Sequence, residues 1–181
     1  KFTNANLKNA NLTSAQFLDA ETTGANLTGA TFFGTFFYTI DFNSIILSNE
    51  LTVTGINSDV GQQFTGPDTI NKISIRTGSV YNNVNTITIN DTTYGTPREG
   101  NQSSELQLTE TNYINEIAYA FDGGSFKFCE YLEFKTSNGD IIKAGNMSTL
   151  SMIHRLKNIK LVKISGKSSS IYLTNLTFTF I

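Results

Sequence analysis

The stretch Val84-Asn85-Thr86-Ile87-Thr88-Ile89 alternates apolar and polar residues over most of its length. A period of two places the apolar side chains on one face, as in a half-buried β-strand. Similar segments recur on both sides of this one, from about Thr39 onward. They are Ile45-Ile46-Leu47, Leu51-Thr52-Val53, Ile73-Ser74-Ile75, Leu106-Gln107-Leu108 and residues 114–121, 131–134, 159–164 and 171–180. Short strands at near-even spacing predict an all-β sandwich, barrel or prism.

Turn-forming residues divide these segments into short units, because glycine and asparagine tolerate the backbone angles of tight turns. One stretch, residues 147–157, resembles a helix, but it lacks an apolar face. We therefore expect a loop with an embedded strand there. The predicted turns are Thr77-Gly78-Ser79, Asn90-Asp91, Asp122-Gly123-Gly124, Ser137-Asn138-Gly139-Asp140 and Ser165-Gly166.

A different period governs the first 37 residues. Alanine recurs at every fifth position from Ala5 to Ala30, and a large residue follows two positions after most of these alanines. Neither a helix nor a strand has a five-residue period. A squared solenoid can turn both positions inward, because each unit buries its face against the units above and below it. The inward positions after the alanines are Leu7, Leu12, Phe17, Thr22, Leu27 and Phe32.

The units Ala5-Asn6-Leu7, Ala10-Asn11-Leu12 and Ala25-Asn26-Leu27 resemble the pentapeptide-repeat family. The resemblance implies a short right-handed β-solenoid with four units per coil over residues 1–38. Fewer than two coils should not be stable alone. The segment is therefore either the end of a longer solenoid or a cap on the next domain. Because the chain starts at Lys1 rather than at Met, we expect a processed or shortened form.

Composition and charge exclude several classes of function. Charged residues make up 15% of the chain and the formal net charge is −2, so no basic surface for nucleic acid is expected. No apolar run approaches the roughly 18 residues that cross a bilayer. A single cysteine, Cys129, excludes an intrachain disulfide. The sequence does not identify the cellular compartment of the protein, and a secreted or cell-surface location is favoured.

An enzyme needs a base, a nucleophile or a metal, and the sequence offers little of each. The single histidine, His154, cannot build a histidine-rich metal site, and no Gly-x-Ser-x-Gly turn exists. Cys129 lies in a strand-like run, which favours a buried, inert thiol. Glu130 and Glu133 are three residues apart and point to opposite faces of a strand. We predict no catalytic residue, no metal and no cofactor.

Several stretches after Gly55 resemble jacalin-related lectins, in the order in which that family has them. The nearest match is Leu132-Glu133-Phe134-Lys135-Thr136-Ser137-Asn138-Gly139, which is similar to the family's Leu-x-Phe-x-Thr-Asn-x-Gly hairpin with one residue inserted. The other similar segments are residues 70–78 with 84–89, residues 106–109 with 112–117, and residues 159–168. The order of these segments, rather than any one of them, carries the resemblance.

This resemblance implies a β-prism of three four-stranded, Greek-key-like sheets over residues 39–181. It also implies a shallow site for mannose- or galactose-type sugars at one end of the prism. The family builds that site from loop backbone and an aspartate, without metal and without catalysis. A sugar offers adjacent hydroxyls, which backbone N–H groups and a carboxylate can bind.

The sequence departs from the family at this site. Gly61 is the counterpart of the family's glycine-rich first loop, and Thr174 stands where the family has its sugar-binding aspartate. A hydroxyl cannot accept two charge-assisted hydrogen bonds as a carboxylate does. The serines of the last loop either supply replacement donors or form only a polar surface turn. The candidate sugar-binding residues are Gly61, Asp122, Ser168, Ser169, Ser170 and Thr174.

Two functions follow from the sequence. The first is a non-catalytic carbohydrate-binding module, which would attach a larger protein to mannose- or galactose-type glycans. The alternative is a structural or protein-interaction β-prism that has lost sugar binding, and the missing aspartate favours it. The partner is accordingly a glycan or a protein, not a nucleic acid, and a homo-oligomer is compatible with either function.

Overall fold

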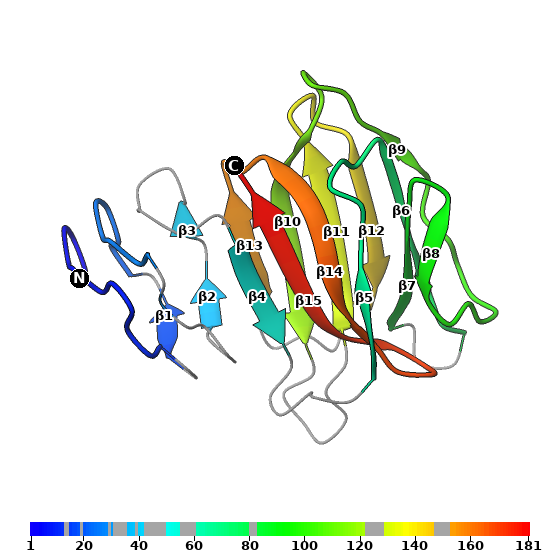
Figure 1. The fold of residues 1–181 in the computed structure, drawn as a ribbon, viewed down its shortest axis with the longest axis horizontal. Helices are drawn as coiled ribbons and strands as arrows, with labels where there is room; N and C mark the ends of the chain where they lie inside the picture. Colours follow the sequence, from blue (N-terminus) through cyan, green and yellow to red (C-terminus); the bar gives the residue numbers. More distant parts are fainter. Residues whose placement is uncertain are drawn as a thin grey trace.

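The fold was analysed in a computed structural model of the chain, which is all-β over the residues that it describes (Figure 1). These residues are 1–12, 15–18, 20–28, 30, 36–38, 40–41, 50–54, 61–79, 83–121, 129–146 and 153–181. The strands are β1 Gln16–Leu18, β2 Phe36–Tyr38, β3 Ile40–Asp41, β4 Glu50–Thr54, β5 Gln62–Thr65, β6 Lys72–Thr77, β7 Val84–Ile89, β8 Thr92–Gly95, β9 Leu106–Gln107, β10 Ile114–Phe121, β11 Cys129–Thr136, β12 Ile141–Gly145, β13 His154–Lys157, β14 Leu161–Ser168 and β15 Leu173–Phe180. Among them is no helix long and apolar enough to cross a membrane.

Three sheets form the body of the molecule, as the β-prism expectation requires. One has the strand order β4-β15-β14-β5, the second has β8-β7-β6-β9, and the third has β12-β11-β10-β13-β3. The third sheet has five strands rather than the expected four, because β3 adds to its edge parallel to β13. The N- and C-terminal parts of the prism meet in the first sheet, where β4 pairs with β15.

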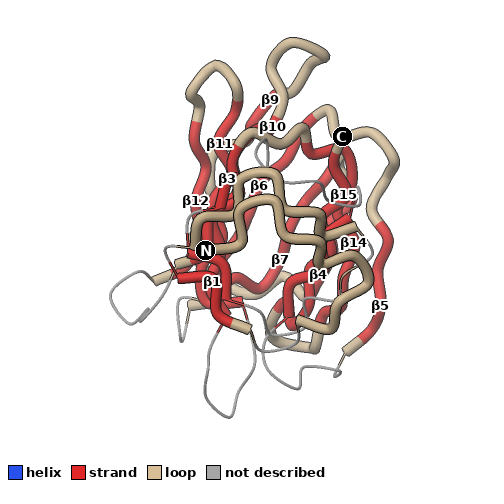
Figure 2. Tube along the Cα trace, turned by 90° about the vertical axis from the view of Figure 1, so that its left-hand side faces the viewer, coloured by secondary structure: helices blue, strands red, loops and turns tan. Residues whose placement is uncertain are grey.

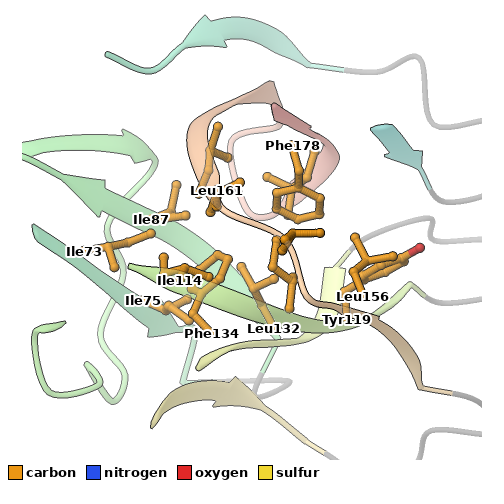
Figure 3. Close-up of a cluster of buried hydrophobic side chains, with 14 of the residues drawn as sticks. Ile73, Ile75, Ile87, Ile114, Tyr119, Leu132, Phe134, Leu156, Leu161 and Phe178 are labelled. Atoms are coloured by element: carbon orange, nitrogen blue, oxygen red, sulfur yellow. The ribbon is translucent and has the colours of Figure 1, made fainter. Parts of the chain in front are cut away.

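Apolar side chains from all three sheets meet inside the prism (Figure 3). The strand predicted at residues 84–89 is confirmed as β7, in which Ile87 and Ile89 are fully buried and pair with Ile75 and Ile73 of β6. The half-buried pattern is not observed over its first four residues, because Asn85 and Thr86 are buried as well. Phe178 of β15 packs edge-on against Phe134 of β11, with ring centroids 6.4 Å apart. Removal of these side chains from water is the main favourable contribution to folding of the prism.

The N-terminal segment is a solenoid with four five-residue units per coil. Strand β1 pairs in parallel with β2 so that Gln16 lies beside Phe36, and an isolated parallel bridge joins Asn6 to Asn26. Both pairings join residues twenty positions apart, as the five-residue period predicts. Phe17 and the small Thr22 are both buried inside the coils, so Thr22 keeps the inward position of the large residues.

The solenoid and the prism share one apolar interior. Phe17, Ala25 and Leu27 belong to the same cluster of buried side chains as the prism residues. The parallel pairing of Leu156 with Ile40 continues the backbone hydrogen bonding from the prism to the segment that leaves the second coil. In the end-on view the coils are stacked across the end of the sheets (Figure 2). This packing is compatible with both readings of the segment, a cap on the next domain and the end of a longer solenoid.

The expected turn at Ser165-Gly166 is wrong, because both residues lie inside β14. Gly166 is needed there for close packing rather than for a chain reversal, since a β-carbon on it would lie 2.1 Å from the carbonyl oxygen of Asn175. The strand expected within residues 147–157 is confirmed as β13. Two other predictions, the strand at residues 45–47 and the turn at residues 122–124, lie outside the described residues.

Candidate functional site

A groove of about 620 Å³ lies where the edge strand of the first sheet, β5, faces the edge strand of the second sheet, β8. The end of β14 and the loop after it form one wall. Its described lining residues are Gly61, Gln62, Gln63, Phe64, Thr93, Tyr94, Gly95, Thr96, Ser168, Ser169 and Ser170. The groove therefore brings together four of the six candidate sugar-binding residues, namely Gly61 and the three serines.

The wall of the groove depends on a close approach of two backbones. Strand β5 runs antiparallel to β14, with Gln62 opposite Ser168, and Gly61 precedes this pair. A β-carbon on Gly61 would lie 2.5 Å from the carbonyl oxygen of Ser168, and its φ of +125° disfavours other residues as well. Glycine is thus required at this position for the first loop to lie against the last one.

Ser169 closes the tip of the last loop. Its hydroxyl oxygen accepts hydrogen bonds from the backbone N–H groups of Ile171 and Tyr172, at 3.2 and 3.0 Å. The backbone N–H of Ser169 donates to the carbonyl oxygen of Tyr172 at 2.9 Å. Because its polar groups form these hydrogen bonds within the turn, Ser169 shapes the groove. The neighbouring Ser170 is exposed and lies at the rim of the groove.

Thr174 does not line the groove with the serines. It is 5% exposed, and its hydroxyl donates a hydrogen bond to the carbonyl oxygen of Lys167 at 3.2 Å. The position at which the resemblance to lectins leads us to expect an aspartate therefore serves the pairing of β14 with β15. Asp122, the second acidic candidate, lies outside the described residues. None of the described lining residues carries a charged side chain.

Two aromatic side chains in the groove were missed by the sequence reasoning. Phe64 of β5 stacks on Tyr94 of β8, with ring centroids 4.8 Å apart and an angle of 24° between the planes. Both rings are half-buried, pack against the main apolar cluster and line the groove. The only signal in the sequence was a single aromatic residue inside each of two otherwise polar runs, about thirty positions apart.

The side chains considered for catalysis lie elsewhere. Cys129 is fully buried as predicted, and burial raises the pKa of its thiol, which disfavours the reactive thiolate. The backbone of His154 belongs to β13, opposite Tyr119 of β10, away from the strands that line the groove. Within the described part of the chain, no three side chains of His, Cys, Asp or Glu come together as metal ligands would.

Comparison with known proteins agrees with both parts of the fold. Residues 1–29 match the family model of pentapeptide repeats, with eight copies. The chain also shares its fold, over about three quarters of its length, with solved lectin structures. A variant of Malaysian banana lectin superposes with a TM-score of 0.58 at 14% identity, covering 73% of this chain and 96% of the lectin. No curated protein is significantly similar in sequence.

Two further structures show the same similarity. Artocarpin in complex with mannopentose gives a TM-score of 0.54 at 12% identity, over 74% of this chain and 99% of artocarpin. A prostate-specific glycoprotein lectin gives 0.55 at 17% identity, over 72% of this chain and 98% of that lectin. The chain thus has an N-terminal pentapeptide-repeat segment followed by the β-prism fold of jacalin-related lectins.

Proposed function

We propose that the chain is a non-catalytic carbohydrate-binding module, in which residues 1–38 form a capping solenoid and residues 39–181 form a lectin-like β-prism. The observation that carries the proposal is the groove between Gly61 and the loop of Ser168–Ser170. These are the two loops at which the family resemblance locates a sugar. The likeness to lectins, one of them solved with mannopentose, supports the same function.

The groove offers the means to hold a sugar without reacting with it. Its walls combine backbone groups of two adjacent strands with exposed amide and hydroxyl side chains. Such groups bind hydroxyls through hydrogen bonds of ordinary strength. A module of this kind would attach a larger protein to glycans, and mannose- or galactose-type sugars are the first ligands to test.

A glycan array probed with the whole chain tests this function. We expect binding that is lost in Ser170→Trp, because Ser170 stands at the lip of the groove and an indole there would obstruct it. Ser104→Trp is the matched control, since Ser104 is an exposed serine that does not line the groove. Failure to bind any glycan, with an unchanged circular dichroism spectrum, would contradict the proposal.

The alternative is a β-prism that docks a protein. It is favoured by one observation, the burial of Thr174 where the family has its aspartate. Without that carboxylate, a single sugar ring loses its strongest hydrogen bonds. The two functions differ on the array, because a protein-docking domain would leave every glycan unbound while keeping its fold.

A further inference from the structure

A second cleft lies at another corner of the prism, where the third sheet meets the second. Strand β12 is an edge strand of the third sheet, and in Figure 1 it stands between β11 and β6. The cleft beside it has a volume of about 370 Å³ and shares no described residue with the groove between β5 and β8. We call it the β12 cleft, and its described lining residues are Thr77, Asn101, Gln102, Ser103, Tyr131, Lys143, Ala144 and Gly145.

One wall of the β12 cleft is a strand edge with unpaired backbone groups. Hydrogen-bonded and non-hydrogen-bonded residue pairs alternate along an antiparallel pair of strands. At the turn between β11 and β12, the N–H of Thr136 donates to the carbonyl oxygen of Asp140 at 2.9 Å. The pair Glu133–Lys143 lies three positions further along the same register and is therefore non-hydrogen-bonded. The N–H and carbonyl groups of Lys143, and likewise those of Gly145, point away from β11, and no described residue bonds to them.

The opposite wall is a second strand edge. Residues 101–103 run antiparallel to β6, where an isolated bridge pairs Gln102 with Arg76. Two backbone hydrogen bonds close the bridge, one from Thr77 to the residue before Gln102 and one from the residue after it to Ile75, at 2.9 and 2.7 Å. Because both bonds flank Gln102, its own N–H and carbonyl groups point away from β6. The β12 cleft therefore lies between two strand edges that offer backbone donors and acceptors.

Strand edges of this kind bind extended polypeptides, because an added strand satisfies their N–H and carbonyl groups. The side chains of β12 define which strand would fit. Ile142 and Ala144 are buried, whereas Lys143 between them is exposed on the outer face. Residues directly opposite on a neighbouring strand share a face, so an added strand needs apolar residues beside Ile142 and Ala144 and an outward residue opposite Lys143.

The charge of Lys143 selects the partner. Within the described lining of the β12 cleft, Lys143 alone is charged, and no described residue forms an ion pair with it. Its neighbour across β11, Glu133, is paired with Arg155 instead. A second copy of the chain, paired through this edge about Lys143, would place two lysines opposite each other, which is unfavourable. An acidic residue opposite Lys143 has the complementary charge.

We propose that the β12 cleft binds an extended segment of another protein, which adds to β12 as an antiparallel strand. The segment carries an acidic residue opposite Lys143 and apolar residues on either side of it. This surface is separate from the groove between β5 and β8, so the inference does not depend on sugar binding there.

Peptide titration, followed in amide NMR spectra of the isotope-labelled whole chain, tests this inference. The probe is acetyl-Thr-Val-Glu-Val-Thr-amide, and its counterpart has Lys in place of Glu. We expect the Glu peptide to shift the amide signals of Gln102, Lys143 and Gly145 and to bind about fivefold more tightly than the Lys peptide, since opposite charges on facing positions stabilise strand pairs and like charges destabilise them. N-methylation of the Glu residue removes the N–H that would donate to the carbonyl oxygen of Lys143, so it should abolish the shifts.

Lys143→Glu tests the charge from the side of the protein. The variant should reverse the preference, so that the Lys peptide binds more tightly than the Glu peptide. Lys8→Glu is the matched control, because Lys8 is another exposed lysine and does not line the β12 cleft. It should keep the preference of the unchanged chain. Should Lys143→Glu fail to fold, the three peptides on the unchanged chain decide the result.

The contrary outcomes are distinct. Equal affinity for the Glu and Lys peptides overturns the acidic partner, and binding that survives N-methylation overturns strand addition. Amide signals of Lys143 and Gly145 that stay in place with every peptide overturn the site. If the same signals change with protein concentration in the chain alone, a second copy covers the edge and the proposed partner is wrong. The glycan array bears only on the groove, so either proposal can fail without the other.

Discussion

The α-carbon of Gly61 lies so close to the carbonyl oxygen of Ser168 that a β-carbon on Gly61 would be only 2.5 Å from that oxygen. The contact joins the segment before β5 to the end of β14, and it forms the wall of the groove. The backbone of Ser168 cannot move away without disturbing its pairing with Gln62 and Leu173. The wall of the groove therefore requires a residue without a side chain at position 61.

Gly61→Ala should lower the free energy of unfolding by about 2 kcal/mol or more, since it combines a positive φ with a backbone clash. Gly139→Ala separates the two causes, because Gly139 also has a positive φ, +95°, but nothing lies within 4 Å of its β-carbon position. We expect Gly139→Ala to lower the free energy of unfolding by about 1 kcal/mol. Urea unfolding measures both, and equal losses in the two variants would remove the clash as a cause.

Thr174→Asp, which introduces the aspartate that the resemblance to lectins leads us to expect here, should destabilise the protein rather than create a sugar anchor. The position is buried and beside the carbonyl oxygen of Lys167, which cannot donate a hydrogen bond to a carboxylate. We expect the free energy of unfolding of Thr174→Asp to be lower than that of the wild type by about 2 kcal/mol or more at neutral pH.

The pH dependence of this variant follows from burial. A buried carboxyl group has a pKa above its unfolded value of about 3.9, so the folded state binds more protons between the two pKa values. The free energy of unfolding must then fall as the pH rises through that window and recover in acid. Thr174→Val, which cannot ionise, should lose about 1 kcal/mol at every pH. A Thr174→Asp protein as stable as the wild type at neutral pH would show that the side chain reaches water.

Arg155 joins two carboxylates on the third sheet. One of its guanidinium nitrogens, Nη1, lies 3.1 Å from Glu116 and 3.1 Å from Glu133, whose side chains are only 14% and 12% exposed. Although burial alone lowers the pKa of Arg155, its hydrogen bonds and charge interactions with both glutamates raise it. Tyr131 also donates its hydroxyl hydrogen bond to Glu133. Arg155 thus lies between two poorly hydrated negative charges, and Lys135 adds a second cation with its Nζ 3.9 Å from Glu116.

Arg155→Met should therefore cost about 3 kcal/mol at neutral pH, because Glu133 loses its ion-pair partner and Glu116 is left with the more distant Lys135, at 3.9 Å. The control is Lys163→Met, which breaks an ion pair with Asp68, a side chain that is 88% exposed. That loss should not exceed about 1 kcal/mol. Thermal or urea unfolding compares the two, and a smaller effect at Arg155 than at Lys163 would contradict the assigned balance of charge.

Leu27→Ala tests whether the solenoid and the prism fold together. Leu27 is fully buried in the cluster that continues into the prism, so its truncation should cost about 3 kcal/mol. Leu7→Ala, at a half-exposed inward position of the first coil, should cost clearly less. A shared core predicts a single unfolding transition that shifts as a whole in both variants. A separate early transition in Leu27→Ala would show that the coils unfold alone.

Alternation in the sequence predicted strands that carry several apolar residues and missed a strand that carries only one. Strand β7 was found because Ile87 and Ile89 point into the core. Strand β5 was missed because it is an edge strand with a single apolar residue, Phe64, so it has no period to detect. The glycine at position 166 was mistaken for a turn signal, since the sequence does not reveal how closely two strands approach.

The same limit applies to the candidate site. Gly61 and the serines of the last loop were predicted together through a family resemblance, and the structure places them in one groove. The contact between Phe64 and Tyr94 depends on the edges of two different sheets, which no local pattern encodes. A threonine at position 174 looked like a weakened ligand, but only its burial showed that it serves the fold.

Strand β3 ties the end of the second coil into the prism through its parallel pairing with β13, and the two parts share one interior. This pairing and the shared interior hold the end of the second coil against the prism. In Figure 1 the coils stand at one end of the long axis, and β5 and β8 stand toward the other. A ligand in the groove would therefore lie at the opposite end of the molecule from a partner bound to the coils.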